Sequence, residues 1–306
     1  MAQFLIRRAL QGMLVILGVT LVVFVATRMV GDPVQMMLPL SASAEQRAAF
    51  SQQLGLDQPL GTQFLAFVGD LLRFDFGDSL WQRRPAIEIV LTKLPRTLEL
   101  IAAGFGFAVI LGVPLGALAA MRPDGLWDRI IVSLSLIGLS VPQFWLGLIL
   151  VMVFAVGLGL FPTSGSGSLS HLVLPALTLG IPSMARIMML TRSSVIAELN
   201  QQYVRTARAR GLPFAHILFG HAMRNALVPV LTLAGWEVIS AWAGYTVVVE
   251  TVFAWPGLGM TAMGAINHSD MFLLQAIVFV VALGIVLVSL LLDLLYKLID
   301  PRIDLA

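Results

Sequence analysis

Residues that could perform chemistry are scarce in this chain, and they do not form the common catalytic patterns. There is no cysteine, which excludes disulfides, thiol catalysis and cysteine-bound metals. The only lysines, Lys93 and Lys297, do not follow a glycine, so the G-x-x-x-x-G-K-[ST] loop for nucleotide phosphates is absent. No G-x-S-x-G occurs, and no H-E-x-x-H is formed by the four histidines, which are His171, His216, His221 and His268. The sequence therefore predicts a chain that is not an enzyme and that binds no metal or cofactor itself.

One basic segment, "YVRTARARGLPFAHILFGHAMRN" from Tyr203 to Asn225, stands out in so apolar a chain. Apolar residues recur at helical spacing from Ile196 to Arg210, which predicts a helix. Gly211 suits a C-terminal stop for this helix, and Pro213 can open the next one. The segment has no acidic residue, and its arginines are Arg205, Arg208, Arg210 and Arg224.

The second predicted helix carries apolar side chains on two sides. Phe214, Ile217 and Leu218 form one face, and Phe219 and Met223 form another. A helix that is apolar on more than one side is normally buried. We therefore expect it to lie between the chain's own membrane domain and a partner protein. The alternative, that the arginines only fix topology or contact anionic lipid, stays open on the residues alone.

Two carboxylates fall in an apolar run from about Ala226 to Glu250. Glu237 lies near its middle, where an ionised group is costly and marks a functional site by default. The alternative for Glu237 is a carboxylate that is protonated or paired with a neighbour such as Arg186. Glu250 lies at the end of the run, before Trp255-Pro256-Gly257. The alternative to a functional role for Glu250 is that it is a solvated acid at the membrane interface, with Trp255 at the level of the lipid headgroups.

These residues must be positioned by membrane helices. Of the 306 residues, 58% are hydrophobic and 12% are charged, against about 25% charged in soluble domains. Apolar runs of about 20 residues are long enough to cross a bilayer as helices. The isoelectric point of 9.4 accompanies a net charge of only +2, and the basic residues stand at the ends of apolar runs. This distribution favours membrane topology over nucleic-acid binding.

Six transmembrane helices are expected. The first runs from about Ala9 to Val30 and is expected to stay uncleaved, because its apolar run is longer than that of a signal peptide. The stretch from Ile130 to Ala185 has no charged residue and is interrupted at Phe161–Ser170, which predicts the third and fourth helices on either side. The second, fifth and sixth helices are expected near residues 100–121, 226–250 and 273–292.

Gly112, Gly116 and Ala120 recur every four residues in the second predicted helix. Small residues at this spacing let helices approach closely. We expect this stripe to be a packing surface.

Basic residues in the short loops set the orientation, since they are enriched on the cytoplasmic side. Some short loops and both ends carry lysine or arginine, whereas the loops at 161–172 and 251–272 carry none. We therefore expect both termini and the basic segment in the cytoplasm. The long stretch at 31–95 then lies outside, where it could form small helices that contact a binding protein or cap the pore.

The basic segment and several other motifs resemble those of ABC-importer permeases. "RTARARG" resembles the cytoplasmic loop motif E-A-A-x-x-x-G, with Arg205-Thr206-Ala207 in place of E-A-A and Gly211 at the glycine. His221-Ala222-Met223-Arg224 replaces I-x-L-P, as in the dipeptide/oligopeptide/nickel subfamily. The other motifs are "GDP" at 31–33, "LGLDQPL" at 54–60, "ETVFAWPGLG" at 250–259, "DLLY" at 293–296 and "DPR" at 300–302. The likeness covers nearly the whole chain and is closest to the first, or B, permease of dipeptide or glutathione importers.

The resemblance implies an all-α polytopic protein of the bacterial inner membrane with the type I ABC importer permease fold. It implies a heterodimer of two permeases, two subunits that bind ATP and magnesium, and a periplasmic solute-binding protein. Residues 1–94 would hold the first helix and a periplasmic region, 95–296 the permease domain, and 297–306 a cytoplasmic tail.

The resemblance also assigns roles to residues. Within a coupling loop at 196–225, the ATPase would contact Arg205, Thr206, Ala207, Gly211, Phe214, Ile217, Phe219, His221 and Arg224. The resemblance would place Glu250, Trp255, Pro256 and Gly257 near the external gate. Glu237 joins this expected translocation pathway because of its place within the span and not through the resemblance, since the subfamily usually has an uncharged residue there.

Two other classes of function compete with this one. A secondary transporter would gain from inverted repeats and several midplane carboxylates, and only Glu237 lies near the centre of a span. An intramembrane enzyme would need one of the absent motifs. Within the importer class, dipeptides, oligopeptides, glutathione, nickel chelates and opines all remain open as substrates.

Overall fold

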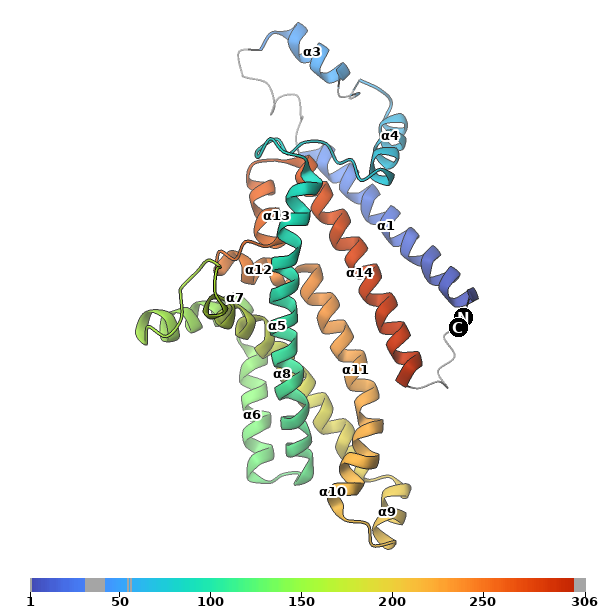
Figure 1. Cartoon of the computed structure of the whole chain (residues 1–306), viewed down its shortest axis with the longest axis vertical. Helices are drawn as coiled ribbons and strands as arrows, with labels where there is room; N and C mark the ends of the chain where they lie inside the picture. Colours follow the sequence, from blue (N-terminus) through green and yellow to red (C-terminus); the bar gives the residue numbers. More distant parts are fainter. Residues whose placement is uncertain (1, 31–41, 54, 56, 300–306) are drawn as a thin grey trace. The chain divides into compact units, whose positions relative to one another are not determined.

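The computed structural model describes residues 2–30, 42–53, 55 and 57–299, and within them the all-α expectation is confirmed. The "GDP" and "DPR" motifs and residues 300–306 of the predicted tail lie outside the described residues. The α-helices drawn in Figure 1 are α1 (Ala2–Val30), α3 (Ala44–Gln53), α4 (Leu60–Leu72), α5 (Ala86–Met121), α6 (Leu126–Ser140), α7 (Gln143–Leu150), α8 (Leu169–Leu199), α9 (Gln202–Ala209), α10 (Phe214–Ile217), α11 (Met223–Ser240), α12 (Thr246–Val252), α13 (Leu258–Asn267) and α14 (Met271–Ile299). Three π-helical segments join them: η1 (Val151–Gly157), η2 (Leu218–Ala222) and η3 (Ala241–Tyr245).

The count of membrane spans depends on one bent helix pair. In the described residues, five helical runs are long and apolar enough to cross a membrane, and α6 with α7–η1 makes a sixth if it is one span bent by 105°. The bend occurs where Val141 is extended before Pro142, because a proline disfavours helix at the preceding residue. If the pair is one span, it is the third of the six expected helices; otherwise the described residues hold five. The other five runs are residues 6–26, 86–121, 169–199, 214–252 and 271–295.

The second span is longer than the sequence suggested. We expected it to begin near Leu100, whereas α5 begins at Ala86. The added turns include Ile89 and Val90, which are fully buried against neighbouring apolar residues. Their packing stabilises helix in a stretch that composition assigned to the outer loop. The expected small helices in the rest of that loop are present as α3 and α4.

The chain divides into two compact units, the first made of residues 1–95 and 257–286. Its core includes Phe76 and Phe279, whose ring centroids are 5.3 Å apart. The buried carboxylate of Asp270 accepts hydrogen bonds from the Ser79 hydroxyl, from the Trp81 amide at 3.2 Å and from the Leu273 amide at 3.1 Å. This carboxylate thus ties the loop before α5 to the first turn of α14.

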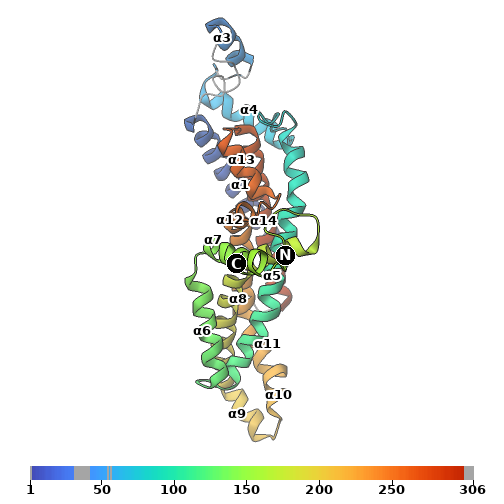
Figure 2. The ribbon, with the colours of Figure 1, turned by 90° about the vertical axis from the view of Figure 1, so that its left-hand side faces the viewer.

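The second unit contains residues 96–256 and 287–306, and α8 is its central helix. This helix packs against α6 on one side and α11 on the other, as Figures 1 and 2 show. The small-residue stripe of α5 also packs on it. A Cβ added at Gly112 would lie 3.0 Å from the Met184 carbonyl oxygen, and one at Gly116 would lie 2.4 Å from the Met188 carbonyl oxygen. The predicted packing role of this stripe is confirmed.

Candidate functional site

The basic segment begins with a break that the sequence did not predict. We expected one helix from Ile196 to Arg210, but α8 ends at Leu199 and α9 starts at Gln202. The Asn200 side-chain amide donates to the Ile196 carbonyl oxygen at 3.1 Å. Asparagine side chains compete with the backbone for such hydrogen bonds, which favours helix ends. The break turns α9 away from the end of α8.

The turn after α9 matches the expectation. Gly211 has φ +75°, and its amide donates to the Arg208 carbonyl at 2.9 Å. The Leu212 amide donates to the Ala207 carbonyl at 3.2 Å. This pair of bonds is the Schellman motif, which needs a left-handed residue and so favours glycine. Pro213 then precedes α10, and its carbonyl accepts from the Ile217 amide at 3.2 Å.

The helix after Pro213 is not a separate element. Residues 214–252 form one helical run, in which η2 joins α10 to α11 and η3 joins α11 to α12. The expected second helix is therefore the first part of the fifth span. The π-helical turn at η2 rotates the side chains that follow it, so the two apolar faces have other members than predicted.

Burial separates the two apolar faces clearly. The inward face contains Ile217, Leu218 and Met223, which are at most 9% exposed and pack within this chain. The outward face contains Phe219, which is 68% exposed, and Phe214, which is 38% exposed. The assignment of Ile217 to direct contact with a partner is therefore wrong, because its side chain is enclosed by α9. The grouping of Met223 with Phe219 is also wrong, because Met223 is buried among residues of α5, α8 and α11.

The other predicted contact residues divide in the same way. Ala207 is buried together with Val204 and Ile217, and this cluster holds α9 against α10. The rings of His221 and His216 meet edge to face at 5.5 Å. Figure 2 shows α9 and α10 side by side, beyond the ends of α8 and α11. Of the other predicted contact residues, Arg205, Thr206, Gly211, His221 and Arg224 are exposed, as are the neighbouring Arg208 and Arg210.

A polar cluster that the sequence did not predict joins three helices at the edge of this surface. The Tyr203 hydroxyl donates to a Glu198 carboxylate oxygen at 2.6 Å, and the Asn225 amide reaches the same oxygen at 3.3 Å. Burial, and then the hydrogen bond to Glu198, raise the pKa of Tyr203 to about 12. The phenol therefore stays protonated and remains a donor near neutral pH. The only sequence signal was an unpaired acid at the end of an apolar run.

Glu237 lies in α11 and is paired, which was the alternative reading of this residue. Arg186 in α8 donates from Nε to Oε1 at 2.5 Å and from Nη2 to Oε2 at 2.8 Å. The Ser183 hydroxyl donates to Oε2 at 2.6 Å. The Glu237 side chain is 3% exposed, whereas that of Arg186 is 33% exposed. The pair is thus a bidentate bridge that is open only on the arginine side.

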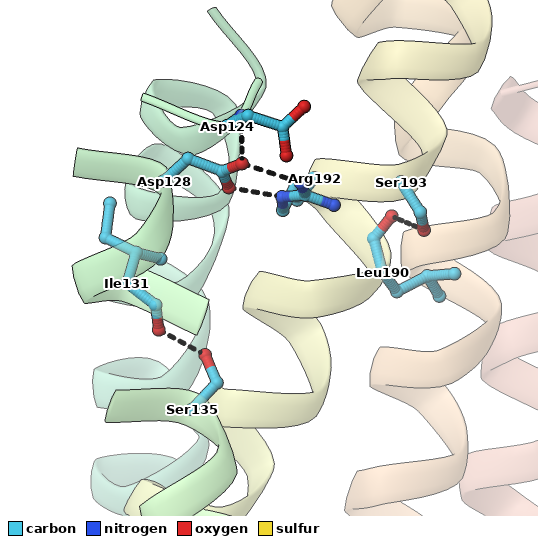
Figure 3. Close-up of polar contacts among 7 residues, drawn as sticks. All are labelled: Asp124, Asp128, Ile131, Ser135, Leu190, Arg192 and Ser193. Atoms are coloured by element: carbon cyan, nitrogen blue, oxygen red, sulfur yellow. Dashed lines mark hydrogen bonds and ion pairs between the residues drawn. The ribbon is translucent and has the colours of Figure 1, made fainter. Parts of the chain in front are cut away.

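A second buried ion pair, shown in Figure 3, was not predicted. Arg192 of α8 contacts both carboxylate oxygens of Asp128 in α6, and the Asp124 amide donates to Asp128 at 2.8 Å. In the sequence, the loop between α5 and α6 indicates only a cytoplasmic location, through its arginines. An arginine within the apolar run of α8 was the signal that could have pointed to a partner.

Glu250 is not at a solvated interface. Its side chain is fully buried, and the Thr97 hydroxyl donates to it at 2.7 Å. Trp255 is also buried, and its indole N–H donates to the Arg96 carbonyl at 2.9 Å. The reading of an exposed acid with a tryptophan among lipid headgroups is therefore wrong. These bonds link the end of α12 to α5.

The last two predicted gate residues lie in the next turn of the chain. Pro256 is half-buried, and Gly257 is buried and caps α13, where its carbonyl oxygen accepts from the Thr261 amide at 3.2 Å. In the described residues, no group of three or more histidine, aspartate or glutamate side chains could hold a metal ion.

Comparisons with known proteins agree along the whole chain. Residues 112–305 match the family model "Binding-protein-dependent transport system inner membrane component", and residues 1–101 match the model of the corresponding N-terminal region. The chain is 38% identical to the oligopeptide transport system permease protein AppB of Bacillus subtilis, over 99% of this chain and 100% of that one. It is 39% identical to the di/tripeptide permease DppB of Pseudomonas aeruginosa and 36% identical to the glutathione permease GsiC of Salmonella typhi, with 99% of each chain covered.

Solved structures show the same fold. The chain aligns with a protein of the MetNI methionine ABC transporter in its inward-facing conformation, with a TM-score of 0.59 and 17% identity. The alignment covers 69% of this chain and 96% of that one. The all-helical spans, the full-length likeness and the shared fold lead to one conclusion. The chain belongs to the family of binding-protein-dependent transport system inner membrane components, as a non-catalytic permease subunit of a bacterial ABC importer.

Proposed function

We propose that this permease imports peptides and forms one half of a heterodimeric translocation unit. The full-length identity to oligopeptide and di/tripeptide permeases, 38% and 39%, is the observation that carries the substrate class. Glutathione is the second candidate, because the glutathione permease is 36% identical over the same length. Glutathione is itself a small peptide, so both candidates share amide groups and a carboxylate.

The surface that docks to an ATPase subunit is the exposed face of residues 203–225, which we call the coupling face. It presents Phe214 and Phe219 among exposed arginines. Exposed aromatic side chains ringed by polar groups are typical of protein interfaces. Gly211 sets the turn, and Ile217 supports the face from inside. The excess of arginine on this face favours a cytoplasmic location, with both termini on the same side.

The continuous helix 214–252 offers a mechanical link from the coupling face into the membrane. It carries Phe214 and Phe219 near one end, Glu237 in the middle and Glu250 near the other end. Movement of a docked ATPase would shift this helix as a unit, since helical segments move as rigid elements about hinges or sliding contacts. The buried bonds of Glu250 with Thr97 and of Trp255 with Arg96 would then change at the gate.

The coupling face is tested by truncating its most exposed aromatic residue. Phe219→Ala should weaken ATPase binding by about 30-fold, as expected for loss of an interface hot spot worth about 2 kcal/mol. Co-purification and a binding titration of the detergent-solubilised complex measure the effect. The matched control is Met152→Ala, at a side chain of similar exposure in η1. Unchanged ATPase binding by Phe219→Ala would contradict the docking assignment.

A further inference from the structure

The pair of Arg186 and Glu237 is unequal in access. Both oxygens of Glu237 are occupied, by two guanidinium nitrogens and by the Ser183 hydroxyl. The carboxylate is almost wholly enclosed, while a third of the arginine side chain is exposed. A ligand approaching this pair therefore meets the arginine and not the glutamate.

The exposed part of Arg186 retains donors. A guanidinium has five N–H groups, and the described bonds use Nε and Nη2. Among the described residues no hydrogen bond involves Nη1, which carries two N–H groups. Tyr245 of η3 is a further electrostatic neighbour of Arg186. Donors at this depth cannot face acyl chains cheaply, and such groups face polar cavities or protein. The open edge of Arg186 thus belongs to a polar surface within the membrane.

The charge of the pair decides what that edge can accept. Glu237 balances the charge of Arg186, so the site as a whole is neutral. A second carboxylate would leave one net negative charge in surroundings of low dielectric, which is costly. A neutral carbonyl oxygen accepts the same N–H groups without changing the charge. The site therefore favours neutral acceptors over anionic ones.

We propose that Arg186 is a hydrogen-bond donor in the translocation pathway for the backbone carbonyl oxygens of a peptide in transit, and that Glu237 suppresses its attraction for carboxylates. This proposal rests on the proposed function of peptide import. Backbone carbonyls are present in every peptide, so the contact is independent of side-chain sequence. A neutralised donor also releases its ligand readily, which conduction through a pathway requires.

Glu237→Gln tests the role of the glutamate as a positioning and charge-balancing residue. The amide keeps the shape of the side chain and can still accept from Arg186, but it leaves the arginine charge uncompensated. Initial uptake rates are measured in proteoliposomes with the complete complex, for two peptides that differ only in Glu against Gln. The ratio of the acidic to the neutral rate is then compared between the variant and the unmodified complex. Because both complexes use the same binding protein, its own preference for one peptide cancels in this comparison. We expect Glu237→Gln to raise the acidic-to-neutral ratio at least about fivefold, as expected for one gained charge interaction.

The matched control removes the arginine as well. The double variant Arg186→Gln, Glu237→Gln should return the ratio to within about twofold of the unmodified complex, because the extra charge is gone. It should also slow the uptake of both peptides, because the donor is missing. A ratio that stays unchanged in Glu237→Gln, or uptake of both peptides at the unmodified rate in the double variant, would overturn the proposal. Failure of the proposed function, peptide import, would give a different result: the unmodified complex would show no ATP-dependent uptake of either peptide.

Accessibility gives a second test that does not depend on transport. The chain has no cysteine, so a single thiol introduced by Arg186→Cys can be followed alone. A membrane-impermeant, cationic methanethiosulfonate should modify this thiol in the assembled complex, and excess peptide should slow the reaction. Ile187→Cys is the matched control, because the adjacent Ile187 is fully buried and should not react. Reaction of the Arg186→Cys thiol with a lipid-soluble maleimide alone would place the residue against lipid or the partner permease and overturn the proposal.

Discussion

Each ionised side chain within the apolar part of α8 has an opposite charge in contact. Arg186 is paired with Glu237, and Arg192 with Asp128. Isolated charges are expensive in such surroundings, and a bidentate arginine–carboxylate pair offsets part of that cost. The two pairs join α8 to different neighbours, since Glu237 lies in α11 and Asp128 in α6. They therefore fix the central helix of the second unit on two sides.

Removing one partner of the second pair should destabilise the protein. Asp128→Asn removes the carboxylate that both bonded guanidinium nitrogens of Arg192 contact, which costs about 3 kcal/mol for a buried pair. The expected result is a clearly lower apparent melting temperature in detergent. Glu99→Gln is the control, because it removes an exposed pair with Arg96 and should change stability by about 0.5 kcal/mol or less. Equal melting temperatures for the two variants would contradict a stabilising role for the Asp128 pair.

Tyr203 should titrate unusually late. Its pKa is raised to about 12 from the ordinary 10.0, first by burial and then by the bond to Glu198. The protonated phenol therefore contributes its full stabilisation of the fold below pH 10. This contribution is lost as the pH rises through about 12. The difference in ultraviolet absorbance between the unmodified protein and Tyr203→Phe, followed against pH, isolates this residue. A midpoint near pH 10 would show that the phenol is neither buried nor bonded to Glu198 in solution.

At the scale of elements, the closest approach between α5 and α8 depends on glycine. Gly104, Gly112 and Gly116 each face backbone oxygens of α8 at distances of 3.1 Å or less from an added Cβ. Without an inward hydrophobic force between helices in lipid, such close packing is a main source of their association. The bent pair of α6 and α7 approaches the bundle in a similar way. Gly147 of α7 would place a Cβ 3.2 Å from the Phe253 ring.

Adding one methyl group to a glycine of α5 should destabilise the protein where α5 packs on α8 and should not do so where the glycine faces open space. Gly116→Ala puts a Cβ 2.4 Å from the Met188 carbonyl oxygen and should cost about 1–3 kcal/mol of stability. Gly106→Ala adds a methyl group that meets nothing within 4 Å, so the better helix propensity of alanine should leave stability equal or raised. Thermal unfolding of the two variants in detergent measures the difference. Equal effects at the two positions would contradict the packing of α5 on α8.

At the scale of the whole molecule, a kink in the middle of the continuous helix 214–252 should impair transport without impairing ATPase docking. Thr232 lies in α11, exposed, between the coupling face and Glu237. Thr232→Pro kinks the helix at a cost of about 3 kcal/mol, because the ring clashes with the preceding turn. We expect the ATPase to co-purify as before, while ATP-driven peptide uptake falls severely. Normal uptake would show that the helix does not transmit the movement.

The control for this kink keeps the helix intact. Thr232→Ala removes the γ-methyl group and the hydroxyl that donates to the Val228 carbonyl oxygen at 3.3 Å. Uptake by this variant should stay near that of the unmodified complex. Loss of ATPase binding in Thr232→Pro, but not in Thr232→Ala, would contradict the prediction, because it would show that the kink disturbs the coupling face itself.

The sequence by itself determined the features that depend on composition and local chain preference. Long uncharged runs predicted membrane helices, because only helices satisfy backbone groups in lipid. Gly211 and Pro213 predicted their turn, because left-handed φ and the missing proline N–H are local properties. The motifs at the coupling segment predicted the family, which the comparisons confirm.

Only the tertiary structure decided which side chains meet. Ile217 and Phe219 are equally apolar in the sequence, yet one is enclosed by α9 and the other is exposed. Helical spacing puts the two side chains on opposite sides, but only the packing of α9 shows which side is covered. Glu237 had two open readings until α8 placed Arg186 beside it, 51 residues away in the chain. Contacts between segments that are distant in the sequence arise from how the helices pack, so the residue pattern along one segment does not predict them.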